Sequence, residues 1–450
     1  MPEAPINTDG LPELRAGSAQ LEITPPVGTS LAGYFRDRVS DHVEDPLFAH
    51  ALVLESGGEG IALVSCDVIC MPSTIADPAR EMIAERTGIP GGNVLICATH
   101  THTGPEMRKD RLIPTNDEWL DTVPEMICST VEAACQEMFD AVLLPGRGYE
   151  DRLGSNRLGR RPDGSEVFGK DGTLGPAGPI DPELAAMAVR DHEGTVRAMI
   201  VNYAMHADTV GGTGISAGWP GRVAATLADI YGEQCVTVFL QGTCGDINHA
   251  HWRESRWVGK GIQKATQMGR AVAGLSVDAT ELAEPLEGGE LGCIFRHVEI
   301  PYYTRDEEMR TEIEQMRAQE EIGERDRFVI ECFDEWPHDG DVAQVPVQVM
   351  RVGEAVIVGI PSEVFVSWGL EIKHWSPGEW TFVAELANDW FGYIPTSDQA
   401  HRGAYGAKPI LSRRLEADGG RKMTDAVQVA MWELWEGESA TDRPRMGEGR

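Results

Sequence analysis

Short apolar runs rich in β-branched residues alternate along the chain with longer stretches whose apolar residues recur at helical spacing. The short runs predict strands and the longer stretches predict helices, because side chains repeat every two residues on a strand and about every 3.6 on a helix. The predicted strands are 51–55, 60–67, 93–99, 195–206, 234–241, 345–352, 355–360 and 381–386. The predicted helices are 74–87, 118–141, 219–231, 260–275 and 307–325.

This alternation of strands and helices predicts an α/β fold in which helices flank a mixed β-sheet. Residues 160–182 are rich in Gly, Pro and Asp and are expected to form a long surface loop of the kind that carries or covers active sites. We expect a single catalytic domain over residues 1–436. The polar, Gly-rich segment 437–450 is expected to be a disordered tail.

The composition narrows the class of protein. The hydrophobic share of 42% can fill a large core, while a net charge of -33 repels phosphate backbones and argues against nucleic acid as a partner. No apolar run approaches the roughly 18 residues of a membrane-spanning helix, so no integral membrane association is expected. Nine cysteines without a CxxC pair, and a start without a basic and apolar leader, predict a cytoplasmic protein with reduced thiols.

Two histidines follow the predicted strand 93–99 in the run ATHTHTGP, which spans residues 98–105. In an extended backbone residues i and i+2 point to the same side, so His100 and His102 can face one cavity at the end of the strand. Ligands of α/β sheets bind outside the carboxyl ends of strands, and imidazole is a common zinc ligand. The run therefore indicates a metal site, with a hydrogen-bonded pair of structural histidines as the alternative.

The predicted strand 195–206 also ends on a histidine, His206, which repeats the arrangement at His100. A third run, GTCGDINHAHW at 242–252, follows another predicted strand and contains Asp246 and a second pair of histidines. One interpretation makes this run the wall of a site in which Asp246 orients a ligand. The other makes it a plain Gly-Asp turn with exposed histidines.

The order of these motifs resembles the neutral/alkaline ceramidase family over most of the chain. The resemblance begins at AGSAQLEITPP (16–26) and includes a strand that ends at Asp67 and the HTHTGP run, which is close to the family's HTHSGP. It implies the α/β catalytic domain of a ceramidase, here without the family's C-terminal β-sandwich. It further implies a zinc ion bound by His100, His206, Glu363 and Tyr405. The two histidines also stand out in the local sequence, whereas Glu363 and Tyr405 do not.

The resemblance also implies roles around the metal. His102 and Arg157 would contact the scissile carbonyl. Apart from the resemblance, a histidine of near-neutral pKa could pass a proton to the leaving nitrogen, and we expect His102 in that role, which Asp67 and Asp246 could share. Zinc would lower the pKa of its bound water to about 7 and so supply a hydroxide nucleophile. The expected substrate-binding residues are Asn248, His249 and Tyr393.

Two departures from the family bear on the substrate. Where the family has GDVSPN, this chain has GDINHA at 245–250, and the chain ends soon after Tyr405. We therefore expect a zinc-dependent amidohydrolase acting on a small soluble N-acyl compound or related amide. A true ceramidase acting on N-acylsphingosine is the alternative.

Two further functions remain open. The run GISAG at 214–218 matches the GxSxG of serine hydrolases, but the preceding strand ends at His206 rather than leading directly into Ser216. A non-catalytic metal-binding protein on a hydrolase scaffold is the other alternative, because a fold alone does not determine function. No HExxH, Walker A or dinucleotide fingerprint is present, so Zn²⁺ is the one cofactor expected.

Overall fold

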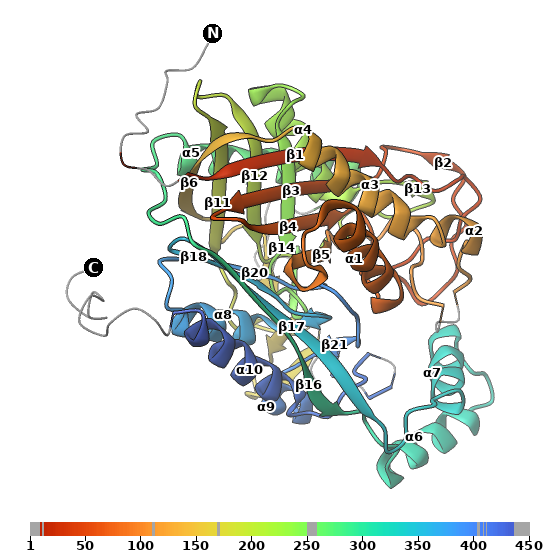
Figure 1. Cartoon of the computed structure of the whole chain (residues 1–450). Coiled ribbons are helices and arrows are strands. Elements are labelled where there is room, and N and C mark those ends of the chain that lie inside the picture. The colour runs from red at the N-terminus through yellow and green to blue at the C-terminus, as the bar shows by residue number, and fades with distance from the viewer. Residues whose placement is uncertain are drawn as a thin grey trace.

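The computed structural model describes residues 10, 13–109, 113–168, 172–249, 259–402, 406–407, 409–410 and 412–435. Tyr405, His251 and the predicted tail 437–450 lie outside these described residues. Within them the chain forms the predicted α/β fold, in which two β-sheets are stacked between helices (Figure 1).

The first sheet has eight strands and is mixed. Its outermost pairs, β12–β14 and β4–β5, are parallel, and the pairs between them are antiparallel. Its strands in spatial order are β14 (Val236–Gln241), β12 (Val196–Tyr203), β11 (Glu183–Asp191), β6 (Phe139–Tyr149), β1 (Arg15–Glu22), β3 (Phe48–Ser56), β4 (Glu59–Cys66) and β5 (Val94–Ala98). The sheet curls, since Ser65 Oγ on β4 donates to the Phe239 carbonyl on β14 at 2.7 Å.

The second sheet packs face to face on the first. Its strands are β16 (Leu291–Pro301), β17 (Val342–Val352), β18 (Ala355–Gly359) and β20 (Trp380–Ala384), with β18 and β20 parallel. Between the sheets lies an apolar core to which both contribute, including Leu95, Ile200, Leu240, Ile357 and Phe382. Burial of such side chains is the main stabilising contribution to a fold of this size.

Helices cover the outer faces of both sheets. On the first sheet α1 (Ser73–Thr87) and α3 (Val123–Gln136) cover the β3–β5 half, and α4 (Gly218–Tyr231) and α5 (Ile262–Thr280) cover the β11–β14 half. On the second sheet the covering helices are α8 (Val366–Trp375) and α10 (Gly419–Glu433). No helix in the described part of the chain has the length and apolar character needed to cross a bilayer.

One arrangement of elements occurs three times. An antiparallel hairpin is followed by a helix and then by a strand parallel to the second strand of the hairpin. The three ββαβ units are β3-β4-α1-β5, β11-β12-α4-β14 and β17-β18-α8-β20. Each unit therefore has one pair of parallel strands, and the carboxyl ends of such a pair are where α/β proteins place ligands.

Three predictions of local structure are wrong. The expected helix 118–141 is two helices, α2 (Asp117–Leu120) and α3, and residues 139–141 begin β6, because the apolar run there pairs with β1 and β11. The expected helix 307–325 is divided into α6 (Glu307–Arg317) and α7 (Glu324–Asp334). The expected loop 160–182 contains parts of a small sheet whose strands are β8 (Leu158–Arg160), β9 (Glu166–Phe168) and β10 (Gly175–Pro176).

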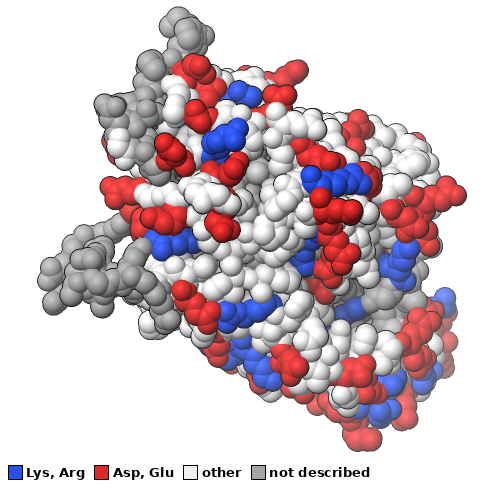
Figure 2. Space-filling model, in the orientation of Figure 1, with Lys and Arg blue, Asp and Glu red and all other residues white. Residues whose placement is uncertain are grey.

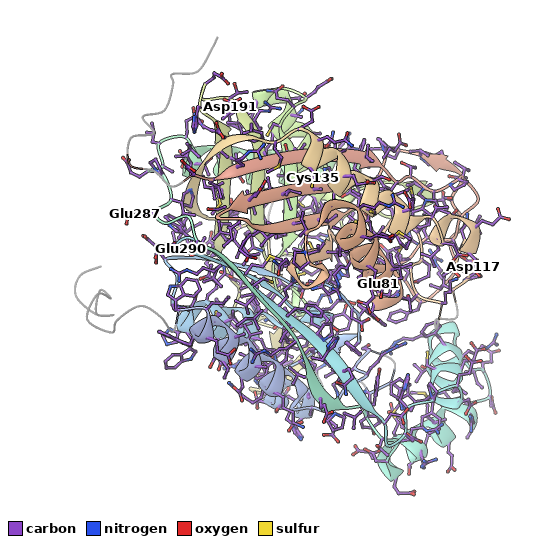
Figure 3. All side chains as sticks on the ribbon, viewed as in Figure 1. Glu81, Asp117, Cys135, Asp191, Glu287 and Glu290 are labelled. Atoms are coloured by element: carbon purple, nitrogen blue, oxygen red, sulfur yellow. The ribbon has the colours of Figure 1, made fainter. Side chains whose placement is uncertain are left out.

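The surface is acidic, as the composition requires. On the face shown in Figure 2, Asp and Glu side chains are spread over most of the molecule and Lys and Arg side chains lie among them. Ion pairs such as Arg86–Glu125, at 2.5 Å, neutralise many of the cations. That face therefore has no continuous basic groove for a nucleic-acid backbone. In Figure 3, Asp117 of α2 lies at the right edge of the molecule and Glu81 lies on α1, and both are exposed to solvent.

Candidate metal centre

His100 lies just beyond the end of β5 in a strained conformation. Its φ is 68°, in the left-handed region that residues other than glycine rarely adopt. Its backbone N–H donates to the Val68 carbonyl at 3.0 Å. The Nδ1 atom is 2.7 Å from the Ile69 carbonyl, which requires the ring to carry its proton on Nδ1. In the neutral ring this leaves the lone pair on Nε2, which faces the imidazoles of His206 and His102. Strained residues of this kind concentrate at functional sites.

Three imidazole rings meet at this point. Nε2 of His206, three residues after β12, lies 3.1 Å from Nε2 of His100, and Nε2 of His102 lies 3.4 Å from the same atom. All three side chains are buried, and their nitrogens form the one group of candidate metal ligands found among the described residues. Trp219 Nε1 donates to the His206 carbonyl at 3.1 Å and fixes the backbone there.

Glu363 provides a carboxylate to the same cluster. It is the first residue of β19 (Glu363–Val364), follows Ser362 with a left-handed φ of 78°, and pairs with Tyr393 on β21 (Tyr393–Ile394). Its Oε2 lies 3.4 Å from Nε2 of His100 and 3.9 Å from Nε2 of His206. Burial opposes ionisation, but His100 and a hydrogen bond from Tyr393 outweigh it and lower the pKa of Glu363 to about 2.

The donor set fits a divalent metal ion. Burial and the nearby His100 lower the pKa of His102 to about 3, and burial lowers the pKa of His206 far below its usual value, so both rings are neutral and can offer a lone pair. Two donors on a tetrahedral zinc ion, each about 2.0–2.1 Å from it, lie about 3.3 Å apart. The spacings of 3.1 Å and 3.4 Å match that geometry.

A buried network behind the cluster was missed by sequence reasoning. Cys244 Sγ is 3.7 Å from Nδ1 of His206 and donates to Glu385 Oε1 at 3.0 Å. The other carboxylate oxygen of Glu385 accepts from the Val364 N–H at 2.6 Å. Glu385, just beyond β20, thus links the ring of His206 to the strand that bears Glu363. A lone Glu after a short apolar run carries no sequence signal, so only the fold shows this role.

Replacing Glu385 with Gln is expected to change how stability depends on pH. Burial raises the pKa of Glu385 well above 4.5, so the folded chain holds this proton more tightly than the unfolded chain. That contribution to the free energy of unfolding is complete below about pH 4.5 and is lost as pH rises toward the raised pKa. Urea unfolding of the metal-free proteins from about pH 5 to 8 should show Glu385→Gln gaining stability relative to wild type. A difference that stays constant with pH would contradict this.

Arg157 and Tyr393 lie beside Glu363. Arg157 follows β7 (Ser155–Asn156), which pairs with β15 (Ile247–Asn248). Its Nη1 donates to the Gly245 carbonyl at 3.2 Å and to the Tyr393 hydroxyl at 3.3 Å, and its side chain is buried. The fold thus brings a cation and a phenol, both singled out from the sequence, to the carboxylate side of the cluster.

Asp246 and Asp67 are buried, but their carboxylates form hydrogen bonds with groups outside the imidazole cluster. Asp246 accepts from the Val366 N–H at 2.8 Å and from Asn156 Nδ2 at 2.7 Å, which joins the start of α8 to β7. Asp67 accepts from Thr99 Oγ1 at 3.1 Å and lines a separate cavity of 190 Å³. The described contacts bring neither carboxylate to the imidazole cluster. Their catalytic role stays a prediction.

Asn248 and His249 meet at another carboxylate that the sequence did not single out, Asp208. Asn248 Nδ2 donates to Asp208 Oδ2 at 3.1 Å, and His249 Nδ1 lies 2.8 Å from Asp208 Oδ1. Asp208 stands two residues after His206, so the expected substrate-binding pair is joined to the segment that carries one of the imidazoles.

The geometry around Ser216 does not support a serine nucleophile. Its side chain is fully buried, and its hydroxyl donates to Asp45 Oδ2 at 2.8 Å. A nucleophilic serine instead gives its proton to a base such as an imidazole, at a surface that substrate can reach. The Ser216 carbonyl also accepts from Thr101 Oγ1 at 2.6 Å, so this residue braces the loop between His100 and His102.

Comparison with known proteins supports this assignment of the fold. No model of a protein family matches the chain, and no curated protein does. The structure resembles the crystal structure of neutral ceramidase from Pseudomonas aeruginosa with a TM-score of 0.73 and 17% identity, over 96% of this chain and 76% of that one. It also resembles a ceramidase complexed with C2 with a TM-score of 0.73 and 16% identity, over 97% of this chain and 78% of that one. The chain therefore has the fold of the neutral ceramidases, with a cluster of three buried histidines at the carboxyl ends of its strands.

Proposed function

We propose that this protein is a zinc-dependent hydrolase that cleaves an amide C–N bond with metal-activated water. The observation that carries the proposal is the spacing around Nε2 of His100, which lies 3.1 Å from Nε2 of His206 and 3.4 Å from Glu363 Oε2, as ligands of one zinc ion do. The third separation, between Nε2 of His206 and Glu363 Oε2, is wider at 3.9 Å. Tyr405 would be the fourth ligand. The similarity to the neutral ceramidase fold supports the reaction class, because the enzyme named there acts on an amide.

The residues around the ligands suit amide hydrolysis. Zinc, when bound, lowers the pKa of its water to about 7. His102 is a neutral imidazole within reach of the ligands, so its N–H can hydrogen-bond the scissile carbonyl. To protonate the leaving nitrogen, the ring would first have to accept the proton that the attacking water releases. Arg157 adds a buried positive charge on the Glu363 side, where it would stabilise the oxyanion that forms during attack.

The proposed substrate is a small soluble amide. The segment that follows Asp246 carries Asn248 and His249, polar side chains that contact Asp208. A polar subsite of this kind suits a hydrophilic amine better than a long hydrocarbon chain. Hydrolysis of N-acylsphingosine is the second candidate, and the structural similarity to ceramidases favours it.

Metal removal tests the proposal. The purified protein is expected to contain about one zinc ion per chain and to cleave members of a panel of N-acyl amides that includes a short-chain ceramide. A chelator should abolish hydrolysis, and added Zn²⁺ should restore it, because the metal-bound water is the nucleophile. Hydrolysis that survives complete removal of zinc would overturn the proposal, and cleavage of ceramide alone would favour the second candidate.

A substitution at Gly33 would test how strongly activity depends on the position of the His102 ring. The φ of Gly33 is 96°, and a Cβ atom there would lie 2.6 Å from Cγ and Nδ1 of the His102 ring. Gly33→Ala is therefore expected to displace the ring and to lower kcat/KM by about a hundredfold, since misplacement by about 1 Å can cost that much. Kinetics and zinc content would be measured together. The matched control is Gly28→Ala, where φ is also positive but a Cβ meets no neighbour.

A further inference from the structure

Asp208 is a mostly buried carboxylate close to the imidazole cluster. It lies between β12 and α4, and its side chain is only 15% exposed. Among the ion pairs of the described residues, Asp208 has no arginine or lysine partner.

The contact between Asp208 and His249 leaves both groups incompletely satisfied. His249 Nδ1 is 2.8 Å from Asp208 Oδ1, but the ring is not aligned for a hydrogen bond, and both atoms are buried without one. Asn248 satisfies the other carboxylate oxygen at 3.1 Å. A buried acceptor without a donor is costly, so Asp208 Oδ1 is suited to receive a donor from a bound molecule.

Tyr34 and Arg38 connect the segment that carries Asp208 to the loop of His102. The ring of Tyr34 lies edge-on to His102, with centroids 5.9 Å apart, and its hydroxyl is beside Gly211. Arg38 donates to the carbonyls of His102 and Gly212, at 2.6 Å and 2.8 Å, and so fixes the His102 loop to the segment that follows Asp208. Arg38 therefore holds the segment after Asp208 against the loop that carries His102.

We propose that Asp208 and His249 form an amine subsite, which binds an ammonium or N–H donor on the leaving side of the substrate. The assignment of this subsite to the leaving side rests on the proposed function, in which amide hydrolysis releases an amine that is protonated at neutral pH. A carboxylate that has no arginine or lysine partner among the described residues attracts that ammonium group and repels an acidic group in the same position. The subsite thus selects amides whose amine portion is cationic and excludes those whose amine portion is an amino acid with a free carboxylate nearby.

Binding of a small ammonium ion tests this without any turnover. Isothermal titration calorimetry would compare n-butylammonium with 1-butanol on the zinc-loaded protein at neutral pH and moderate salt. Wild type is expected to bind the ammonium ion at least about tenfold more tightly than the alcohol. Asp208→Asn should lose this preference and Asp208→Glu should keep it. The matched control is Asp229→Asn, which removes an exposed acid on α4 and should behave as wild type.

The outcomes separate this proposal from the proposed function. Equal binding of the two probes by wild type, or a preference that survives in Asp208→Asn, overturns the amine subsite even if amides are cleaved. The zinc content and the unfolding midpoint of each variant would be measured on the same samples. If Asp208→Asn does not fold, His249→Gln tests the same subsite, because it should weaken the preference for the ammonium ion. A selective ammonium site in a protein that cleaves no amide would overturn the proposed function alone.

Hydrolysis adds a second readout. N-(2-aminoethyl)acetamide and N-propylacetamide have nearly the same shape, but only the first carries an ammonium group on its amine side. The ratio of their kcat/KM values is expected to fall at least about tenfold in Asp208→Asn and to stay unchanged in Asp229→Asn. A ratio that is the same in wild type and Asp208→Asn overturns the specificity assigned to Asp208.

Discussion

Replacing His100 with alanine is expected to remove the bound zinc ion almost completely, to less than about a tenth of an ion per chain. Nε2 of His100 lies at the centre of the cluster, within 3.4 Å of donors on His206, His102 and Glu363. Amide hydrolysis should fall at least about a thousandfold, since loss of a group that merely supports a ligand already costs about 10–100-fold. Elemental mass spectrometry and kinetics on the same samples would check both effects.

Two companion variants make this result specific. Glu363→Ala should lose zinc in the same way, because it removes the carboxylate from the cluster. His297→Ala removes an exposed histidine on β16 and should keep the zinc content of wild type. Zinc that persists in both His100→Ala and Glu363→Ala would show that the ion binds elsewhere.

Replacing His102 with alanine is expected to separate ligation from catalysis. The proposed ligands His100, His206, Glu363 and Tyr405 remain, so the zinc content should stay near that of wild type. Hydrolysis should fall by about 10²–10⁴-fold, which is the usual contribution of a positioned acid or base. This variant therefore tests whether the buried ring of His102 acts on the substrate rather than on the metal.

Zinc content is the measurement that decides the role of His102. Its Nε2 is 3.4 Å from Nε2 of His100, which is also the spacing of a ligand. Loss of zinc in His102→Ala, with the chain still folded by circular dichroism, would make His102 a third imidazole ligand. The role of the scissile-carbonyl contact would then pass to Arg157.

Several strands and the class of the fold could be predicted because the buried parallel strands are short, continuous apolar runs. Predictions 60–67, 93–99, 195–206 and 234–241 correspond to β4, β5, β12 and β14. β1 and β16 were missed because polar and half-exposed residues interrupt their apolar positions. The start of β6 was taken as helix, since nothing in the local sequence shows that 139–141 pairs with β1 and β11.

Only part of the candidate site has a local sequence signal. His100, His102 and His206 were identified because each follows an apolar strand, and the structure brings their rings together. Glu363 was identified only through the family resemblance. Asp208 and Glu385 were missed, because what distinguishes them is burial beside other titratable groups, and burial depends on segments far away in the sequence.

The three ββαβ units also determine when during folding a metal ion can be captured. His100, His206 and Glu363 each follow a strand of a different unit, and the first two are 106 residues apart in the chain. No unit alone holds more than two of the clustered imidazoles, so the unfolded chain and its early intermediates offer no strong chelate. Closing loops of this length costs entropy before the ligands can act together. Zinc is therefore expected to bind after the three units have folded. It would then cross-link them rather than nucleate the folding of any one of them.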